Sequence, residues 1–276
     1  MSDVLPPLRE VIERYDLAAK KSLGQHFLLD LNMTRKIARA ANVSANDVVL
    51  EIGPGPGGLT RALLESGAQV IAIERDNRCI EALGEVAHAF DHRLTLIEAD
   101  ALSIDEATIT GDATPVKIVA NLPYNISTEL LVKWLKAGPA LWSIMGLMFQ
   151  KEVADRILAA PGSKTYGRLS IISQTASKPS RAFNLPARAF TPPPKVDSTV
   201  VLFDQPAEQF GHMAQLEQVT QAAFSQRRKM LRSSLKSVFA TKLSDVLEAT
   251  NIKETQRAEE LSVEQFKQLA THLSKL

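Results

Sequence analysis

The chain has 276 residues, of which 45% are hydrophobic and 23% are charged, and its formal net charge at pH 7 is only +1. These proportions are those of an ordinary folded protein, and they exclude disordered, collagen-like and disulfide-framework chains. The one cysteine, Cys79, rules out an internal disulfide and a cysteine-rich zinc site, and no apolar stretch approaches the roughly 18 residues of a membrane span.

The first three quarters of the chain are predicted to form a sheet covered by helices. Two helices are expected at residues 7–17 and 31–41, joined by a loop. From residue 47 to residue 204, short β-branched runs alternate with helical patterns, which predicts a mostly parallel sheet with helices on both faces. The expected strands are residues 48–52, 69–74, 94–98, 116–120, 144–149, 181–185 and 199–203. The helices between them are expected at residues 58–65, 77–90, 128–136, 151–160 and 168–176.

The end of this pattern indicates a second, smaller domain. Only a proline-rich loop separates the last two expected strands, so they should pair antiparallel at a sheet edge. After Pro206 apolar residues recur at helical spacing, and Ser262 with Gln265 forms a capping-box pattern that would begin a last helix reaching Leu276. We therefore expect a sheet domain at residues 1–205 and an all-helical domain at residues 206–276.

A glycine-rich segment, residues 53–58, follows the first expected strand and opens the first crossover helix. Glycine there lets a ligand approach the backbone closely. The spacing also fits a dinucleotide fingerprint, and Glu74 at the end of the second strand suits a ribose diol with either cofactor. Two acids favour S-adenosylmethionine over a nicotinamide dinucleotide. Glu51 precedes the glycines, and Asp100 follows the third strand, where it can accept a hydrogen bond from an adenine amino group.

The tetrapeptide Asn121-Leu122-Pro123-Tyr124 closes the apolar run 116–120. The exocyclic amine of adenine is a poor nucleophile, and two acceptors aimed at its hydrogens would stabilise it as it becomes tetrahedral and positive. Asn121 can offer its side-chain oxygen. Leu122 can offer its carbonyl, because a residue before proline is extended, and Tyr124 can stack on a base. The pattern predicts methyl transfer to a base amine, although a proline turn with a buried tyrosine would look the same.

A basic cluster lies in the expected helical domain. Its members are Arg227, Arg228, Lys229, Arg232 and Lys236, with no acid among them. Such a cluster can be a solvated helix face or a contact surface for nucleic acid. We favour the second interpretation, in which the cations contact phosphates.

Six segments together resemble the ribosomal RNA adenine N6-dimethyltransferases, and most closely their bacterial branch that modifies the small subunit. These segments are Gly24–Leu28, Glu51–Thr60, Asn121–Thr128, Phe190–Ser198, Phe224–Lys229 and Arg257–Ser262. The resemblance implies an α/β class I, Rossmann-like methyltransferase domain with a small helical domain. It also implies dimethylation of two adjacent adenosines in the hairpin loop near the 3′ end of 16S ribosomal RNA.

The glycine pattern and the resemblance together assign candidate site residues. Contacts to S-adenosylmethionine are expected from His26, Leu28, Gly53, Gly55, Glu74, Asp100 and Asn121. Many relatives carry asparagine at the position of His26, so a backbone contact is expected there. Catalysis is assigned to Asn121, Leu122, Pro123, Tyr124 and Phe190, and RNA binding to Arg227, Arg228, Lys229 and Arg232. The target base would leave its stack and enter a slot between Tyr124 and Phe190. Phe190 could instead simply anchor its own loop.

The expected partner is 16S ribosomal RNA in the small ribosomal subunit or its precursor. A cytoplasmic monomer without metal or membrane attachment is expected, because the N-terminus carries acids and prolines rather than a targeting pattern. Three alternatives stay open. One is an adenine methyltransferase that acts on large-subunit RNA or on DNA, although DNA enzymes usually carry an acid at the position of Asn121. The others are an RNA-binding assembly factor in which methylation is secondary, and a nicotinamide oxidoreductase.

Overall fold

The computed structural model describes residues 5–17, 25–226 and 228–276. The chain forms two compact units. The first comprises residues 1–154 and 180–204, and the second comprises residues 155–179 and 205–276. The expected domain boundary near residue 205 coincides with one of these divisions. Residues 155–179, which were expected in the sheet domain, belong instead to the second unit. The physical reason is that α8 (Arg168–Ala176) packs against α9 (Met213–Ser225) and α13 (Val263–Leu273), inside the core of the second unit.

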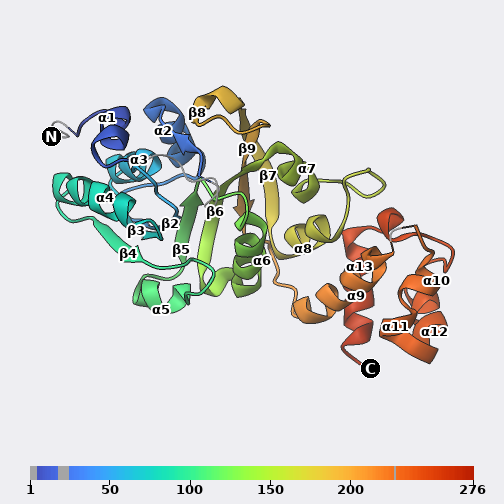
Figure 1. The fold of residues 1–276 in the computed structure, drawn as a ribbon. Coiled ribbons are helices and arrows are strands. Elements are labelled where there is room, and N and C mark those ends of the chain that lie inside the picture. The colour runs from blue at the N-terminus through green and yellow to red at the C-terminus, as the bar shows by residue number, and fades with distance from the viewer. Residues whose placement is uncertain (1–4, 18–24, 227) are drawn as a thin grey trace. The chain divides into compact units, whose positions relative to one another are not determined.

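The first unit is built on a seven-stranded sheet with the order β4-β3-β2-β5-β6-β9-β7 (Figure 1). Its strands are β2 (Val48–Ile52), β3 (Gln69–Glu74), β4 (Leu94–Glu98), β5 (Val116–Ala120), β6 (Trp142–Gln150), β7 (Lys178–Leu185) and β9 (Ser198–Asp204). The strands from β4 to β6 pair in parallel, and β9 pairs antiparallel with β6. The predicted mostly parallel sheet with an antiparallel edge is therefore confirmed.

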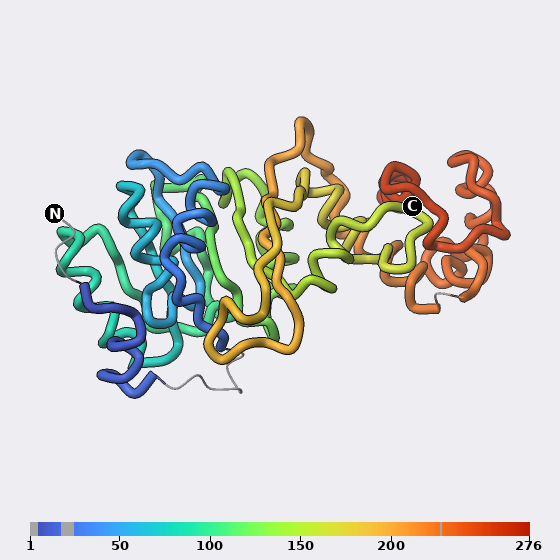
Figure 2. The backbone as a smooth tube through the Cα atoms, turned by 90° about the horizontal axis from the view of Figure 1, so that it is seen from above, coloured from blue at the N-terminus to red at the C-terminus, as the bar shows by residue number. Residues whose placement is uncertain are grey.

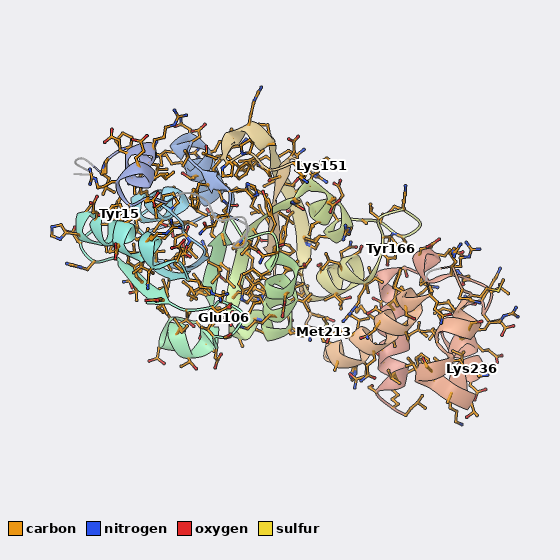
Figure 3. All side chains as sticks on the ribbon, viewed as in Figure 1. Tyr15, Glu106, Lys151, Tyr166, Met213 and Lys236 are labelled. Atoms are coloured by element: carbon orange, nitrogen blue, oxygen red, sulfur yellow. The ribbon has the colours of Figure 1, made fainter. Side chains whose placement is uncertain are left out.

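Helices cover this sheet where the apolar pattern predicts them, apart from one short helix at Glu106–Thr110 that was not predicted. The helices of the first unit are α1 (Leu8–Arg14), α2 (Leu31–Ala40), α3 (Gly58–Glu65), α4 (Asn77–Ala89), α5 (Glu106–Thr110), α6 (Ser127–Ala137) and the start of α7 (Lys151–Ile157). One apolar core joins α2, α3 and α4 to β2 and β3. The buried carboxylate of Glu106, which is labelled in Figure 3, accepts a hydrogen bond of 2.7 Å from the indole of Trp134 on α6. In the described part of the chain, no helix is long and apolar enough to cross a membrane.

A second, two-stranded sheet joins distant parts of the first unit. Strand β1 (Phe27–Leu28) pairs antiparallel with β8 (Phe190–Thr191), so that Leu28 lies opposite Phe190. Figure 2 shows the orange loop that carries β8 beside the blue segment that carries β1. The pairing fixes the segment before α2 against the loop before β9.

The second unit is helical, as the sequence predicts. Beyond α8 and α9 it contains α10 (Leu231–Ser234), α11 (Lys236–Phe239), α12 (Leu243–Ala249) and α13, around a core that includes Phe239 and Phe266. The predicted capping box is present. The backbone amide of Gln265 donates to Ser262 Oγ at 3.2 Å, and the backbone amide of Ser262 donates to Gln265 Oε1 at 3.0 Å. The helix it begins ends at Leu273, three residues before the expected end.

Two glycines offer a matched test of this packing. A Cβ added to Gly58, at the start of α3, would lie 2.6 Å from the Leu28 carbonyl oxygen, whereas one added to Gly84, inside α4, meets nothing within 4 Å. Gly58→Ala is therefore expected to destabilise the protein, because α3 and β1 must separate. Gly84→Ala is expected to stabilise it by about 1 kcal/mol, since alanine is the better helix former. Urea unfolding of both variants measures this, and equal stabilisation by the two would contradict the packing described.

Candidate functional site

A cavity of about 190 Å³ opens where β2, β3 and β5 end, at one edge of the parallel sheet. Ligands of open α/β sheets bind at this edge, beyond the carboxyl ends of the strands. Among the residues predicted from the sequence, those lining the cavity are His26, Leu28, Gly53, Gly55, Glu74, Asp100, Asn121, Leu122, Pro123 and Tyr124. Residues from five separate segments thus meet at one place.

The glycine-rich loop after β2 forms one wall of the cavity. Gly53 and Gly55 have φ values of 66° and 55°, which side chains rarely adopt. A Cβ on Gly55 would also lie 2.9 Å from the ring of Phe27, the first residue of β1. Any larger residue would therefore fill the space between this loop and β1, and the loop can present its backbone to a ligand.

Glu74 ends β3 with its carboxylate fixed by backbone amides. Its Oε1 accepts from the amides of Arg75 at 2.8 Å and Asp76 at 2.9 Å, and its Oε2 accepts from the Gly55 amide at 3.2 Å. Burial raises the pKa of Glu74, and these hydrogen bonds oppose that shift. A carboxylate can accept about four hydrogen bonds, so the group keeps acceptor capacity toward the cavity.

Asp100 is held beside the same wall. Its Oδ1 accepts from the Leu102 amide at 3.0 Å, as a residue that begins a turn would do. Its Oδ2 forms an ion pair of 3.0 Å with Arg75 Nη1. Arg75 also lines the cavity and was not predicted from the sequence. Its position directly after Glu74 was the available signal.

Glu51 lies on the cavity floor with only 1% of its surface exposed. Burial raises the pKa of its carboxyl from 4.5 to about 8, a hydrogen bond of 2.7 Å from Thr60 Oγ1 opposes the shift, and the charge of Glu74 adds to it. The carboxyl is therefore mostly protonated at neutral pH. The acid that precedes the glycines acts as a neutral, buried hydrogen-bonding group.

Asn121 is oriented by a backbone oxygen. Its Nδ2 donates to the His26 carbonyl at 3.0 Å. An amide that donates through nitrogen keeps its side-chain oxygen as an acceptor. Leu122 precedes Pro123, a position that favours an extended backbone, and both residues line the same cavity. The two acceptors predicted from the sequence are thus neighbours in the chain at one wall.

Tyr124 presents its ring beside these acceptors. The imidazole of His26 stacks on the ring with centroids 5.4 Å apart and planes inclined by 29°. The Tyr124 hydroxyl forms a hydrogen bond of 2.6 Å with Ser198 Oγ, and burial raises the pKa of Tyr124. The sequence reasoning missed Ser198 as a positioning residue, although it ends the segment that begins at Phe190.

Phe190 does not line the cavity, contrary to the expectation that it faces Tyr124 across a slot. Its side chain is 2% exposed and lies in the apolar core, opposite Leu28 in the two-stranded sheet. A ring placed there anchors its own loop, which is the alternative that the sequence left open. The aromatic group beside Tyr124 is instead the imidazole of His26.

The basic cluster belongs to the second unit. Arg228, Lys229, Arg232 and Lys236 are exposed, and Figure 3 labels Lys236 on α11. Arg232 lies 3.9 Å from Glu254, a distance that leaves its guanidinium accessible to other anions. Arg227 lies outside the described residues.

Comparisons with known proteins agree on one family. A family model described as ribosomal RNA adenine dimethylase matches residues 17–275. The chain is 55% identical to ribosomal RNA small subunit methyltransferase A of Cereibacter sphaeroides, over 99% of this chain and 98% of that protein. It is 54% identical to the protein of the same name from Chelativorans sp., over 98% and 99% of the two chains. A dimethyladenosine transferase from Plasmodium falciparum has a similar structure, with a TM-score of 0.78, 29% identity, and coverage of 91% of this chain and 98% of that chain.

The buried Glu51 predicts a pH-dependent stability. Since its pKa is about 8 when folded and 4.5 ordinarily, the folded protein holds a proton between these values that the unfolded chain releases. Its contribution to stability is therefore fully present below about pH 4.5 and is lost as the pH rises to about 8. Glu51→Gln cannot ionise, so its stability relative to the wild type should improve from pH 5 to pH 8. Urea unfolding at both pH values measures the difference, and a constant difference would mean that the carboxyl is already charged when folded.

Proposed function

The chain belongs to the ribosomal RNA adenine dimethylase family, and from that premise we propose how its residues carry out the reaction. It is an enzyme that uses S-adenosylmethionine to dimethylate adenosine at N6 in 16S ribosomal RNA. The finer target that we propose is a pair of adjacent adenosines in the hairpin loop near the 3′ end. The observation that supports the mechanism most is the hydrogen bond from Asn121 Nδ2 to the His26 carbonyl. It occupies the nitrogen of the amide and leaves the side-chain oxygen as an acceptor.

The cavity fits S-adenosylmethionine, which supplies an activated methyl group on a sulfonium. A Cβ at Gly55 would fill the space beside Phe27, so the loop can approach such a ligand closely. We assign the ribose hydroxyls to Glu74 and the adenine amino group to Asp100, whose carboxylate also pairs with Arg75. The backbone of His26 and Leu28 and the glycines Gly53 and Gly55 complete this proposed binding site.

The target amine would donate one hydrogen bond to Asn121 Oδ1 and one to the Leu122 carbonyl. This arrangement stabilises the nitrogen as its lone pair leaves the ring and its charge becomes positive. With S-adenosylmethionine bound, the cofactor would supply the methyl carbon to this nitrogen with its sulfur as the leaving group, and the nitrogen would then lose one proton to solvent. Tyr124 would hold the base by stacking, which contributes roughly 1–3 kcal/mol per base, and Ser198 fixes the ring. Positioning then supplies much of the rate.

A second transfer imposes a constraint on the same wall. After one methylation the amine has a single hydrogen, so it can satisfy only one of the two acceptors. We propose that the other acceptor position then faces the first methyl group. The two transfers would therefore differ in rate, although they use the same residues.

We propose that the exposed cations of the second unit bind the RNA backbone. Arg228, Lys229 and Arg232 are exposed, as phosphate contacts require, and Arg227 is assigned with them from the sequence. The substrate would be the small ribosomal subunit or its precursor, met by a monomeric enzyme in the cytoplasm. Nothing in the described residues favours the assembly-factor alternative over catalysis.

The direct test of this function is transfer of labelled methyl from S-adenosylmethionine to small subunits that lack the modification, with large subunits in parallel. Nucleoside analysis should find N6-dimethyladenosine only in small-subunit RNA. Label in the large subunit would assign another substrate, and intact RNA binding without any transfer would favour an assembly factor.

Asn121, Leu122 and Tyr124 form what we call the base-binding wall. Variants of Asn121 and Tyr124 distinguish acceptance of a hydrogen bond from stacking on the base. Asn121→Ala should lower kcat by roughly 10²–10³-fold, the usual cost of removing one transition-state hydrogen bond. Tyr124→Phe should be mild and Tyr124→Ala severe, because stacking needs the ring, while the hydroxyl only fixes it to Ser198. Single-turnover transfer to small subunits measures each effect. Equal damage from both Tyr124 variants would give the hydroxyl the main role, and a wild-type rate for a folded Asn121→Ala would remove Asn121 from catalysis.

A further inference from the structure

Val196 is one of three large hydrophobic side chains that are exposed in the described parts of the chain. It is 41% exposed, and the others are Met230 and the C-terminal Leu276. A single exposed valine is ordinary by itself. Its surroundings are less ordinary, because it lies in the loop of residues 191–198, here called the rim loop, which connects β8 with β9.

The rim loop is fixed at both ends to the wall that holds Tyr124. At its start, the Pro192 carbonyl accepts a hydrogen bond of 2.8 Å from His26 Nδ1, and the His26 ring stacks on Tyr124. At its end, Ser198 Oγ bonds to the Tyr124 hydroxyl at 2.6 Å. These contacts at both ends of the rim loop therefore link its position to that of the Tyr124 ring.

Further bonds hold the residue after Val196. The Asp197 carbonyl accepts from the Lys151 amide at 2.9 Å, and its Oδ1 accepts from the Ala187 amide at 2.9 Å. Lys195, Val196 and the surrounding prolines Pro192 and Pro193 are nevertheless exposed. The loop thus presents a cation and an apolar side chain to solvent between residues, Pro192 and Asp197, that hydrogen bonds hold in place. A contact made there costs little conformational entropy.

The tip lies close to the base-binding wall. Two residues of extended chain span at most about 7 Å, so the Cα atom of Val196 lies within that distance of the Cα atom of Ser198. The Ser198 hydroxyl contacts Tyr124 directly. A nucleotide stacked on Tyr124 would therefore have its neighbours in the RNA near the tip of the rim loop.

Removal of a base from its stack exposes the apolar face of the next base. Proteins that unstack nucleic acids often compensate by inserting an apolar side chain at the vacated place, and they balance the phosphates with cations. Val196 and Lys195 supply this pair of groups side by side. The acid beside them, Asp197, already accepts a backbone hydrogen bond through Oδ1.

We propose that the tip of the rim loop contacts the RNA beside the target adenosine. Val196 packs against the base exposed when the adenosine leaves its stack, and Lys195 pairs with a phosphate of the same nucleotides. This inference rests on the proposed function, since it requires an RNA substrate with an unstacked adenosine. It assigns substrate contacts to two residues outside the cavity.

Five variants at three sites, Val196, Leu276 and Lys195, test the proposal on unmodified small subunits. Val196→Thr keeps the shape but replaces one methyl group with a hydroxyl. Val196→Asp adds a charge that phosphates repel, and Val196→Ile preserves the apolar contact. Leu276→Ser is the matched control, because it removes a more exposed apolar side chain. The dissociation constant for subunits and kcat/KM are measured for each, together with the affinity for S-adenosylhomocysteine and the melting temperature.

Val196→Asp should weaken subunit binding and kcat/KM by roughly tenfold, and Val196→Thr by a smaller factor. Val196→Ile and Leu276→Ser should match the wild type, and all five variants should bind S-adenosylhomocysteine normally. Lys195→Gln should reduce the slope of log affinity against log salt by about one.

Wild-type subunit binding by Val196→Thr and Val196→Asp would overturn the proposal. Weaker binding of S-adenosylhomocysteine or a lower melting temperature in these variants would also overturn it, because Val196 would then have a structural role. Failure of the proposed function is a separate result. In that case the wild-type enzyme itself would transfer no methyl to small subunits.

Discussion

The hydrogen bond from the Asn121 side chain to the His26 carbonyl is the interaction on which the site depends. It decides which end of the amide is an acceptor, and it couples the end of β5 to the segment that carries β1. That segment is fixed in turn by its pairing with β8 and by the contact of His26 with Pro192. The wall of the cavity that we propose to bind the target base is thus held by segments far apart in the sequence. In the proposed mechanism its acceptors are oriented before any substrate arrives, as transition-state stabilisation requires.

The parallel sheet supplies the other half of the arrangement. Because β2, β3 and β5 end at the same edge, Glu51, Glu74 and Asn121 meet around one cavity. Burial and hydrogen-bond partners then differ from one acidic residue to the next. Glu51 is buried enough to be protonated near neutral pH. Glu74 is held by three backbone amides, and Asp100 by an arginine. Similar side chains at one sheet edge are thereby suited to different parts of one ligand.

Much of this fold was predictable because local patterns determine it. The strands at residues 48–52, 69–74, 94–98 and 116–120 have the expected bounds, since each is a short apolar run that glycine, an acid or Asn121 ends. The cavity residues were predictable because strand ends converge in a parallel sheet. Contacts between distant segments could not be predicted in this way. The two-residue strands β1 and β8, the burial of Phe190 and the bond from Tyr124 to Ser198 all depend on such contacts. For the same reason residues 155–179 carry no local sign of belonging to the second unit.

The most direct test of the central claim is a crystal structure of the wild-type protein with S-adenosylhomocysteine and adenosine bound. The predicted result is an adenosine stacked on Tyr124 whose N6 donates to both Asn121 Oδ1 and the Leu122 carbonyl, with the Asn121 amide still bonded to His26. An adenosine whose N6 points away from these two oxygens, or an Asn121 amide turned so that its nitrogen faces the base, would contradict the mechanism.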